Sequence, residues 1–279
     1  MLMSASANRF AHQLLDLRAS SGRIAPLSAS AGISVEDAYD IAKNILDIRT
    51  AEGDRMVGRK IGYTERHHWP NQPSGAPVVP IWAPMYESTV RYAVDNHGIQ
   101  SLQGAQQPRI EPEIVFCLGS APGPDDTIDT IAENIEWMAH GFEIIVSPFP
   151  NWKFAAADAI AAFGMHGTLI IGEPKMLSSA SRRNLSAVLA TASISMSCGR
   201  KGGFSLRGAG FGSDVLESPV HALWHLHQTL QAQPQFAPLA AGEIITTGTW
   251  TEAFTVEPGQ TWSTAFSGVP IPGLTVSFV

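Results

Sequence analysis

The chain has 279 residues, of which 44% are hydrophobic and 15% are charged, so its composition is that of a folded protein rather than a disordered one. A net charge of −7, without a basic cluster, gives no support to binding of nucleic acid or an acidic membrane. No apolar run approaches the roughly 20 residues of a spanning helix, and the amino terminus lacks the apolar core of a signal peptide. Two cysteines, Cys117 and Cys198, do not make a disulfide framework. We therefore expect a cytoplasmic protein with free thiols.

The first fifty residues show two helical patterns. Apolar residues recur at helical spacing over residues 7–20 and again over residues 35–51, and residues 24–28 break the chain between them. Ser34 is the expected N-cap of the second helix, and Gly53 is its expected end. These patterns predict a helical N-terminal section over residues 1–56 and a β-rich body over residues 57–279, with one continuous domain as the alternative.

The remainder of the chain is predicted to be rich in strands and turns, since it holds most of the 25 glycines and 19 prolines. Residues 65–86, which include His67 and His68, are predicted to form a long loop over a site. Helices are expected at residues 127–139 and 218–231. Strands are expected at residues 58–64, 109–116, 141–146, 168–172, 189–196, 204–206, 243–247, 261–266 and 274–279.

Two glutamates on one predicted strand form the first candidate site. Residues 109–116 alternate with a period of two, so Glu111 and Glu113 point to the same face. Adjacent carboxylates raise each other's pKa unless a cation keeps both ionised, and a hard divalent ion such as Mg²⁺ or Mn²⁺ suits oxygen ligands. The alternative is a solvated strand face with two surface glutamates.

Glu143 adds a third carboxylate. It lies on a predicted strand among apolar residues, where an unpaired carboxylate would cost several kcal/mol. Three glutamates on two strands can form an oxygen site with positions open to substrate and water. A buried ion pair with Lys or Arg is the alternative for Glu143.

Other residues are candidates for catalysis and substrate binding. Lys60 could hold a carboxylate or an enolate oxygen near a metal, and Gly62 beside it would let substrate approach the backbone. His166 could act as a general acid or base. The turn that contains Thr249 and Thr251 could hold a substrate carboxylate. The ordinary alternatives are an exposed lysine, a structural histidine and a hydroxyl-bonded turn.

Taken together, these segments resemble the 2-keto-4-pentenoate hydratase and 4-oxalocrotonate decarboxylase group, within the wider fumarylacetoacetate hydrolase superfamily. The likeness covers nearly the whole chain, and its order and spacing are specific. It is carried by residues 24–28, 35–39, 58–64, 110–114, 141–144, 152–153 and 242–249.

The resemblance implies an α+β, β-rich fold with Mg²⁺ or Mn²⁺ held at the positions of Glu111, Glu113 and Glu143. It places Lys60 beside the metal, and it places the substrate carboxylate at the turn around Thr249 and Thr251. It also implies a homo-oligomer. Two departures affect the acid–base chemistry. Residues 80–83 lack the aspartate usual in hydratases of this group, and residues 163–167 replace a serine-containing segment and contain His166.

These implications predict a hydro-lyase that adds water to a 2-hydroxy-2,4-dienoate in aromatic meta-cleavage catabolism, with Lys60 and His166 as candidates for proton transfer. A 2-oxo acid decarboxylase and a carbon–carbon hydrolase are close alternatives, because both would use the same metal and the same enolate. A non-catalytic relative that binds a 2-oxo acid is the alternative from another class, since Ile81 stands where an acid is usual.

Overall fold

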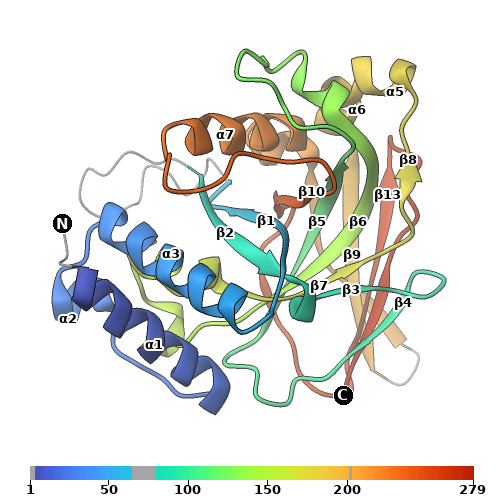
Figure 1. The fold of residues 1–279 in the computed structure, drawn as a ribbon. Helices are drawn as coiled ribbons and strands as arrows, with labels where there is room; N and C mark the ends of the chain where they lie inside the picture. The colour runs from blue at the N-terminus through green and yellow to red at the C-terminus, as the bar shows by residue number, and fades with distance from the viewer. Residues whose placement is uncertain (1–3, 65–79, 201–202) are drawn as a thin grey trace.

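The computed structural model describes residues 4–64, 80–200 and 203–279 of the chain. Two β-sheets lie at its centre, and helices cover parts of the first sheet (Figure 1). The two sheets pack on each other through a buried apolar cluster that joins Ile110, Phe142 and Ile144 of the first sheet to Trp262 and Val276 of the second. The predicted α+β class is therefore confirmed.

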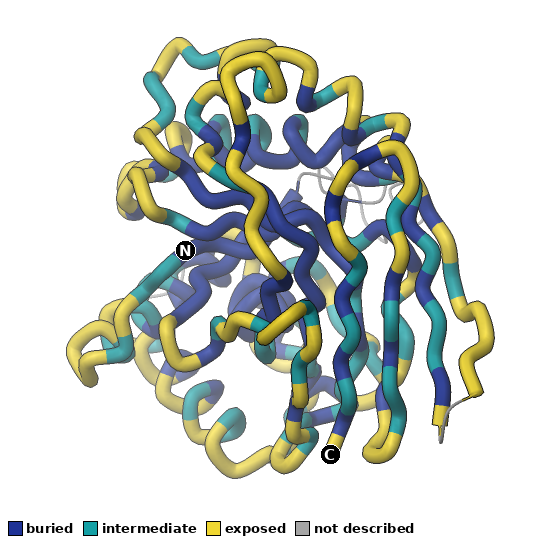
Figure 2. The backbone as a smooth tube through the Cα atoms, turned by 90° about the vertical axis from the view of Figure 1, so that its right-hand side faces the viewer, coloured by how far each residue is buried: buried dark blue, intermediate teal, exposed yellow. Residues whose placement is uncertain are grey.

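The first sheet is mixed and contains the predicted glutamate strands. Its strands follow the order β2-β1-β11-β5-β6-β7-β3, with β1 parallel to β11 and β3 parallel to β7. Figure 2 shows that its central strands are buried along most of their length. The strands are β1 (Met56–Gly62), β2 (Ile81–Tyr86), β3 (Val90–Tyr92), β5 (Arg109–Leu118), β6 (Ile135–Ile145), β7 (His166–Ile171) and β11 (Ile244–Thr249), with β8 (Lys175–Met176) beside β6 and β12 (Phe254–Thr255) beside β5.

The second sheet has the order β10-β9-β13-β14-β4, and its three central strands alternate along much of their length between buried and half-buried residues, whereas the edge strand β10 is mostly exposed (Figure 2). The predicted hairpin is present, although its first strand begins at Ser193 because Leu189 belongs to a helix, and residues 201–202 lie outside the described ranges. The strands are β4 (His97–Gln100), β9 (Ser193–Arg200), β10 (Gly203–Phe211), β13 (Thr261–Ser267) and β14 (Thr275–Phe278).

The two predicted N-terminal helices are present as α1 (Ser4–Ser20) and α3 (Val35–Ala51). Ser34 caps α3 through a reciprocal pair of hydrogen bonds with Asp37, as the sequence pattern predicted. The break between the helices contains the short helix α2 (Leu27–Ala31). Tyr39 of α3 stacks on Trp82 of β2 at 5.8 Å, so these helices share an apolar core with the first sheet. The division at residue 56 stays a prediction.

The other helices lie around the sheets. Ser218 caps α7 and Pro219 begins it, as predicted. The helices are α4 (Ala156–Ala161), α5 (Ser179–Arg183), α6 (Leu185–Thr191) and α7 (Pro219–Gln231), and the 3₁₀ turns are η2 (Glu87–Thr89), η3 (Ile131–Asn134), η4 (Pro150–Trp152), η5 (Phe163–Met165) and η6 (Gly212–Asp214).

The helix predicted over residues 127–139 is wrong. Only η3 is helical there, and β6 begins at Ile135 and pairs with β5. Asp126 accepts hydrogen bonds from the side chains of Thr130 and Asn134, which hold a turn in place of a continuing helix. The apolar spacing follows the helical period, but pairing of β6 with β5 overrides this local pattern.

The prediction of an irregular stretch over residues 65–86 is wrong at its end. Residues 81–86 form β2, which is fully buried and antiparallel to β1. Pro84 is tolerated because β2 is at the end of the strand order and donates fewer ladder hydrogen bonds. Residues 65–79, with His67 and His68, lie outside the described residues, so the predicted lid stays a prediction.

Candidate metal centre and substrate cavity

Strands β5 and β6 bring the three predicted glutamates together. In their antiparallel register Glu111 is directly opposite Glu143, and Glu113 is opposite Gly141. One carboxylate oxygen from each of Glu111, Glu113 and Glu143 lies within 4.8 Å of the others. Glu113 and Glu143 are buried, and Glu111 is half-buried. We refer to these three residues as the glutamate cluster.

The two carboxylate oxygens of Glu113 differ in their hydrogen bonding. Its Oε2 accepts a hydrogen bond of 2.7 Å from the backbone N–H of Gly248. Its Oε1 is buried and has no hydrogen-bond partner within the described part of the chain. Burial and then the negative charge of Glu143 raise the pKa of Glu113 well above its usual value. A buried carboxylate oxygen without a hydrogen-bond partner, in a cluster of three carboxylates, is a suitable ligand for a hard divalent cation.

Lys60, on β1, supplies a positive charge beside the cluster. Its ammonium lies 3.1 Å from Oε2 of Glu143 and donates a hydrogen bond of 3.0 Å to the carbonyl of Gly164. Burial lowers the pKa of Lys60, but the negative charges of Glu143, Glu111 and Glu113 outweigh it and raise the pKa above its usual value. Lys60 is therefore a charged, fixed donor at the cluster.

His166, at the start of β7, is also beside Glu143. Its Nδ1 lies 2.7 Å from Oε1 of Glu143, and its Nε2 lies 2.9 Å from Oγ1 of Thr89. Since a carboxylate only accepts, the Nδ1 proton donates to Glu143, and in the neutral ring Nε2 accepts from the Thr89 hydroxyl. Burial lowers the pKa of His166, which favours this neutral ring. Both ring nitrogens are thus occupied by protein groups.

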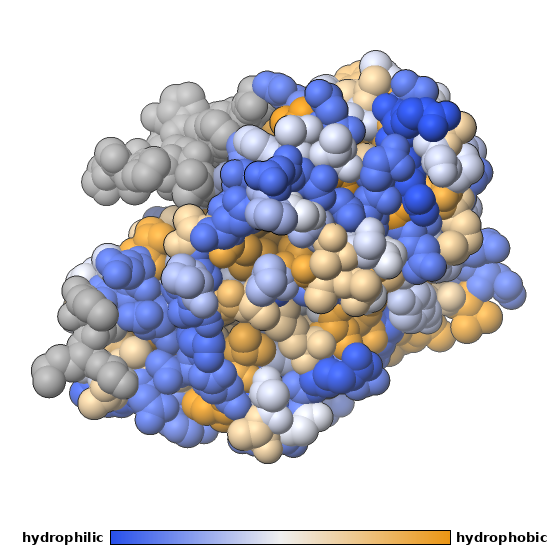
Figure 3. All heavy atoms as spheres, turned by 45° about the horizontal axis from the view of Figure 1, so that its top comes forward, coloured by the Kyte–Doolittle hydropathy of each residue, from blue (hydrophilic) through white to orange (hydrophobic). Residues whose placement is uncertain are grey.

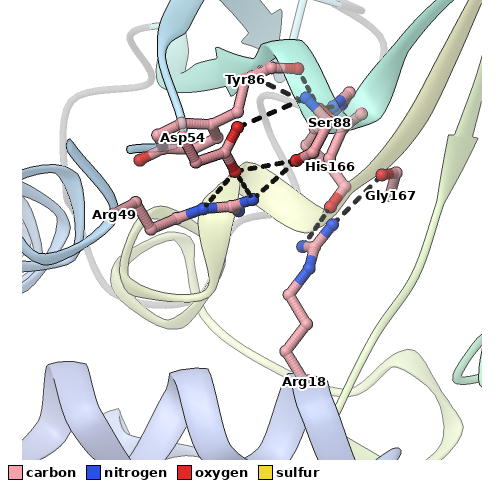
Figure 4. Close-up of polar contacts among 8 residues, drawn as sticks. Arg18, Arg49, Asp54, Tyr86, Ser88, His166 and Gly167 are labelled. Atoms are coloured by element: carbon pink, nitrogen blue, oxygen red, sulfur yellow. Dashed lines mark hydrogen bonds and ion pairs between the residues drawn. The ribbon is translucent and has the colours of Figure 1, made fainter. Parts of the chain in front are cut away.

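Polar side chains from the N-terminal helices reach the far side of His166 (Figure 4). Arg18 of α1 donates hydrogen bonds of 2.6 Å and 3.1 Å to the carbonyl oxygens of His166 and Gly167. Arg49 of α3 pairs with Asp54 and contacts Ser88, close to the turn that carries Thr89. Helices predicted only from their apolar spacing therefore also support the site.

A cavity of about 540 Å³ opens beside the glutamate cluster. Glu111, Lys60, Gly62 and Thr249 line it, and the roles predicted for them stay predictions. Ile81, at the position where an acid is usual, lines it as well.

The predicted threonine turn is shaped by its own hydroxyls. Thr249 Oγ1 donates to the carbonyl of Thr251, and Thr251 Oγ1 donates to the carbonyl of Glu252. Thr251 is buried, whereas Thr249 lines the cavity. The roles of both residues in substrate binding stay predictions.

Sequence reasoning missed Thr89 and Gly248. Thr89 gave no signal, because its contact with His166 joins residues that are 77 positions apart. Gly248 directly precedes Thr249 of the predicted turn, and its glycine was the only signal that its backbone could approach Glu113.

Comparisons with known proteins show the family of this chain. The chain is 30% identical over 259 residues to 2-hydroxyhexa-2,4-dienoate hydratase from Comamonas testosteroni, with 92% of each chain covered. It is 29% identical to a 4-oxalocrotonate decarboxylase from a Pseudomonas species, covering 88% of this chain and 89% of the relative. The chain belongs to the 2-keto-4-pentenoate hydratase and 4-oxalocrotonate decarboxylase group. No family model matches the sequence.

Solved structures confirm the fold. The 4-oxalocrotonate decarboxylase from Pseudomonas putida G7, complexed with magnesium and adipate, aligns with a TM-score of 0.87 at 21% identity, over 100% of this chain and 99% of that chain. A putative fumarylacetoacetate hydrolase family protein from Yersinia pestis CO92 aligns with a TM-score of 0.53 at 14% identity, over 80% of this chain and 93% of that chain. Among the described residues, no helix is both long and apolar enough to cross a membrane.

Proposed function

We propose that this protein is a divalent-metal-dependent hydro-lyase that adds water to a 2-hydroxy-2,4-dienoate in aromatic meta-cleavage catabolism. The observation that carries the proposal is the glutamate cluster: Oε1 of Glu113 has no hydrogen-bond partner among the described residues, the charged Lys60 lies 3.1 Å from Glu143, and Glu111 and Lys60 line a cavity of about 540 Å³. The hydratase relative supports the same reaction. A homo-oligomeric state and a cytoplasmic location stay predictions.

Glu111, Glu113 and Glu143 would hold Mg²⁺ or Mn²⁺, both of which take oxygen ligands. The magnesium reported for the aligned decarboxylase supports this assignment. When bound, such an ion supplies Lewis-acid polarisation of the substrate carboxylate and 2-oxygen.

Lys60 and the cavity backbone would orient the substrate. The ammonium of Lys60 has a donor to spare beyond Glu143 and Gly164, and it would stabilise negative charge on the 2-oxygen. The absence of a side chain at Gly62 lets the substrate approach the wall of the cavity. The turn at Thr249 would face the substrate carboxylate.

The two proton-transfer candidates have different surroundings. Lys60 lines the cavity, so it can exchange a proton with a bound substrate directly. His166 is buried with both nitrogens bonded, and we propose that it holds Glu143 in position. The catalytic role predicted for His166 would require its bond to Thr89 or to Glu143 to break.

Decarboxylation of a 2-oxo acid is the second candidate, because the decarboxylase relative is nearly as similar to this chain as the hydratase relative. Both reactions use the same enolate, so only the product distinguishes them. Release of carbon dioxide from a 2-hydroxydienedioate, without hydration of a monocarboxylic dienoate, would favour decarboxylation.

The test is to supply 2-hydroxypenta-2,4-dienoate with Mg²⁺ or Mn²⁺ and to follow loss of the dienoate absorbance. We expect turnover with metal and loss of at least about 100-fold in Glu143→Gln, since that substitution removes a charged ligand. Glu257→Gln is the control, because Glu257 pairs with Arg200 on the exposed surface. No turnover of any 2-hydroxydienoate with either metal would refute the proposal.

A further inference from the structure

The second sheet has one side in the core and one side turned away from it. Met196 of β9 and Trp262 of β13 belong to the buried cluster between the two sheets. Because side chains alternate along a strand, the residues between them point away from the first sheet. Ser195 and Ala265, which pair across β9 and β13, are on this second side. We refer to it as the outer face of the second sheet, whose strands lie side by side in Figure 2.

Large apolar side chains stand at both edges of the outer face. Phe204, Leu206 and Phe211 of β10 lie opposite outer-face residues of β9 and are 52%, 67% and 55% exposed. We refer to these three residues as the apolar ridge. Ile99, at the other edge on β4, pairs with Ser277 and is 72% exposed. Large apolar side chains that gather on one exposed face mark an interaction surface, whereas single ones do not.

Between these two edges the outer face is made of small, uncharged residues. Its residues on β9, β13 and β14 are all Ser, Thr, Ala or Gly. Within residues 4–64, 80–200 and 203–279, no Asp, Glu, Lys or Arg of the five strands is on this face. Arg207 of β10 lies over the ring of Trp262, on the other side of the sheet. Ordinary protein surfaces are rich in these charged residues, and removing water from a face without them leaves no charge unpaired.

The edges of this sheet are less suited to a partner than its face. The pairing of β10 with β9 shifts register between Leu206 and Gly208, so the edge strand is irregular in its middle. The other edge strand, β4, has only 4 residues. Irregular and short edge strands are the usual means by which proteins prevent edge-to-edge pairing. A partner would therefore cover the outer face rather than extend the sheet.

We propose that the outer face of the second sheet binds the same face of a second copy of this chain. A two-fold axis brings the same patch of both copies together, so the apolar ridge of each copy packs on the small residues of the other. At strand spacings of about 4.8 Å and about 3.3 Å per residue, the five strands present about 500 Å² per copy, and a pair reaches the roughly 1,000 Å² that a specific interface needs. The proposal concerns assembly and does not rest on the proposed function.

Sedimentation velocity of the intact chain tests this interface. The sedimenting mass should rise from the 29.9 kDa of one chain to twice that value as the concentration increases from about 0.5 to about 50 µM. Leu206→Glu should raise the dissociation constant of the pair at least about 100-fold, because each copy would bury an unpaired carboxylate. Ala265→Lys should have the same effect from the central strand β13. Since the two changes are on different strands, one of them remains informative if the other fails to fold.

Met176→Glu is the matched control, because Met176 is also an apolar side chain that is 63% exposed, but it is on β8 beside the first sheet. This variant should associate as tightly as the intact chain. The interface is refuted if the intact chain keeps the mass of one chain at about 50 µM, if the folded Leu206→Glu and Ala265→Lys variants associate as before, or if Met176→Glu weakens association equally. No residue of the outer face lines the cavity, so Mg²⁺ affinity should be the same in all variants. Failure of the interface and failure of the hydratase proposal are therefore distinguishable.

Discussion

At the scale of single residues, the glutamate cluster depends on a backbone group at Gly248. The pairing of β11 with β5 shifts register between Thr246 and Thr249, and this irregularity frees the Gly248 N–H to bond Glu113. Gly248 has a φ of +100°, and a Cβ there would lie 2.0 Å from Oγ1 of Thr64. The position therefore requires glycine on two counts, backbone conformation and space.

Gly248→Ala should destabilise the protein and weaken its metal binding. Gly242 provides the control, because its φ is +85° but a Cβ there meets nothing within 4 Å. Gly242→Ala should cost about 1 kcal/mol of unfolding free energy from the left-handed backbone alone. Gly248→Ala should cost about 2 kcal/mol more from overpacking. Chemical denaturation measures the free energy of unfolding of both variants. An equal decrease in Gly242→Ala and Gly248→Ala would contradict the role of Thr64.

Residue types and alternation were enough to predict the glutamates as candidate ligands, but not the groups that hold them. Glu111 and Glu113 share a strand with a clear period of two, so their common face follows from the sequence. Contacts such as that of Thr89 with His166 depend on the register and crossings of several strands. No pattern within one segment contains that information.

At the scale of elements, α1 contacts the start of β7, which carries His166 next to the glutamate cluster. Arg18 donates hydrogen bonds to the carbonyls of His166 and Gly167 (Figure 4). It also lies over the ring of Phe163, at 4.6 Å from the ring centroid. Burial lowers the pKa of Arg18 to about 10, so its guanidinium is still charged at neutral pH. Helix α1 therefore stabilises the segment from which His166 reaches Glu143.

Arg18→Met should lower stability by about 2–4 kcal/mol, because two carbonyls lose a charged donor. It should also weaken Mg²⁺ binding several-fold, since His166 would no longer be held against Glu143. Arg9→Met is the control on the same helix, because Arg9 is exposed and lies over Phe10 at 5.0 Å. Calorimetric titration with Mg²⁺ measures the affinity. An unchanged affinity in a destabilised Arg18→Met protein would limit α1 to a role in folding.

Elements with strong local signals were predicted correctly, and those decided by tertiary pairing were not. The helix α3 has a capping box and a regular apolar stripe, so its bounds follow from the sequence. The start of β6 was predicted as helix because Ile131, Ile135 and Met138 recur at spacings of four and three, the helical period. Pairing of this part of β6 with β5 on one side and β8 on the other made the strand more favourable.

At the scale of the whole molecule, two packed sheets and the surrounding helices enclose the glutamate cluster, in which Oε1 of Glu113 has no hydrogen-bond partner among the described residues. Hydrophilic and apolar residues are interspersed over the outer face of the molecule in Figure 3. The metal-free chain holds Glu113 and Glu143 within one cluster, at 1% and 0% exposure. Metal binding should therefore stabilise the fold and depend on pH.

The two buried glutamates have opposite effects on the pH dependence of the metal-free protein. Burial and the charge of Glu143 raise the pKa of Glu113 in the folded protein. Its contribution to stability is therefore complete below the pKa of the unfolded chain, about 4.3, and is lost as pH rises through the folded pKa. Burial alone would raise the pKa of Glu143, but Lys60 and His166 lower it to about 2, so its contribution is lost only as pH falls toward that value. Of these two glutamates, only Glu113 contributes to the slope above about pH 5.

A divalent ion bound by the glutamate cluster would replace the proton on Glu113. Because this proton is held less tightly as pH rises, stabilisation of the protein by metal should increase with pH. At 100 times the dissociation constant it should reach about 2.7 kcal/mol. The measurement is the Tm of metal-free and Mg²⁺-saturated protein from pH 5 to pH 8, where we expect the gap to widen. Glu113→Gln should remove both the gap and its pH dependence, whereas Glu136→Gln, an exposed change on β6, should leave them intact. If the difference in Tm between the metal-free and the Mg²⁺-saturated protein stays constant from pH 5 to pH 8, metal binding does not displace a proton from Glu113.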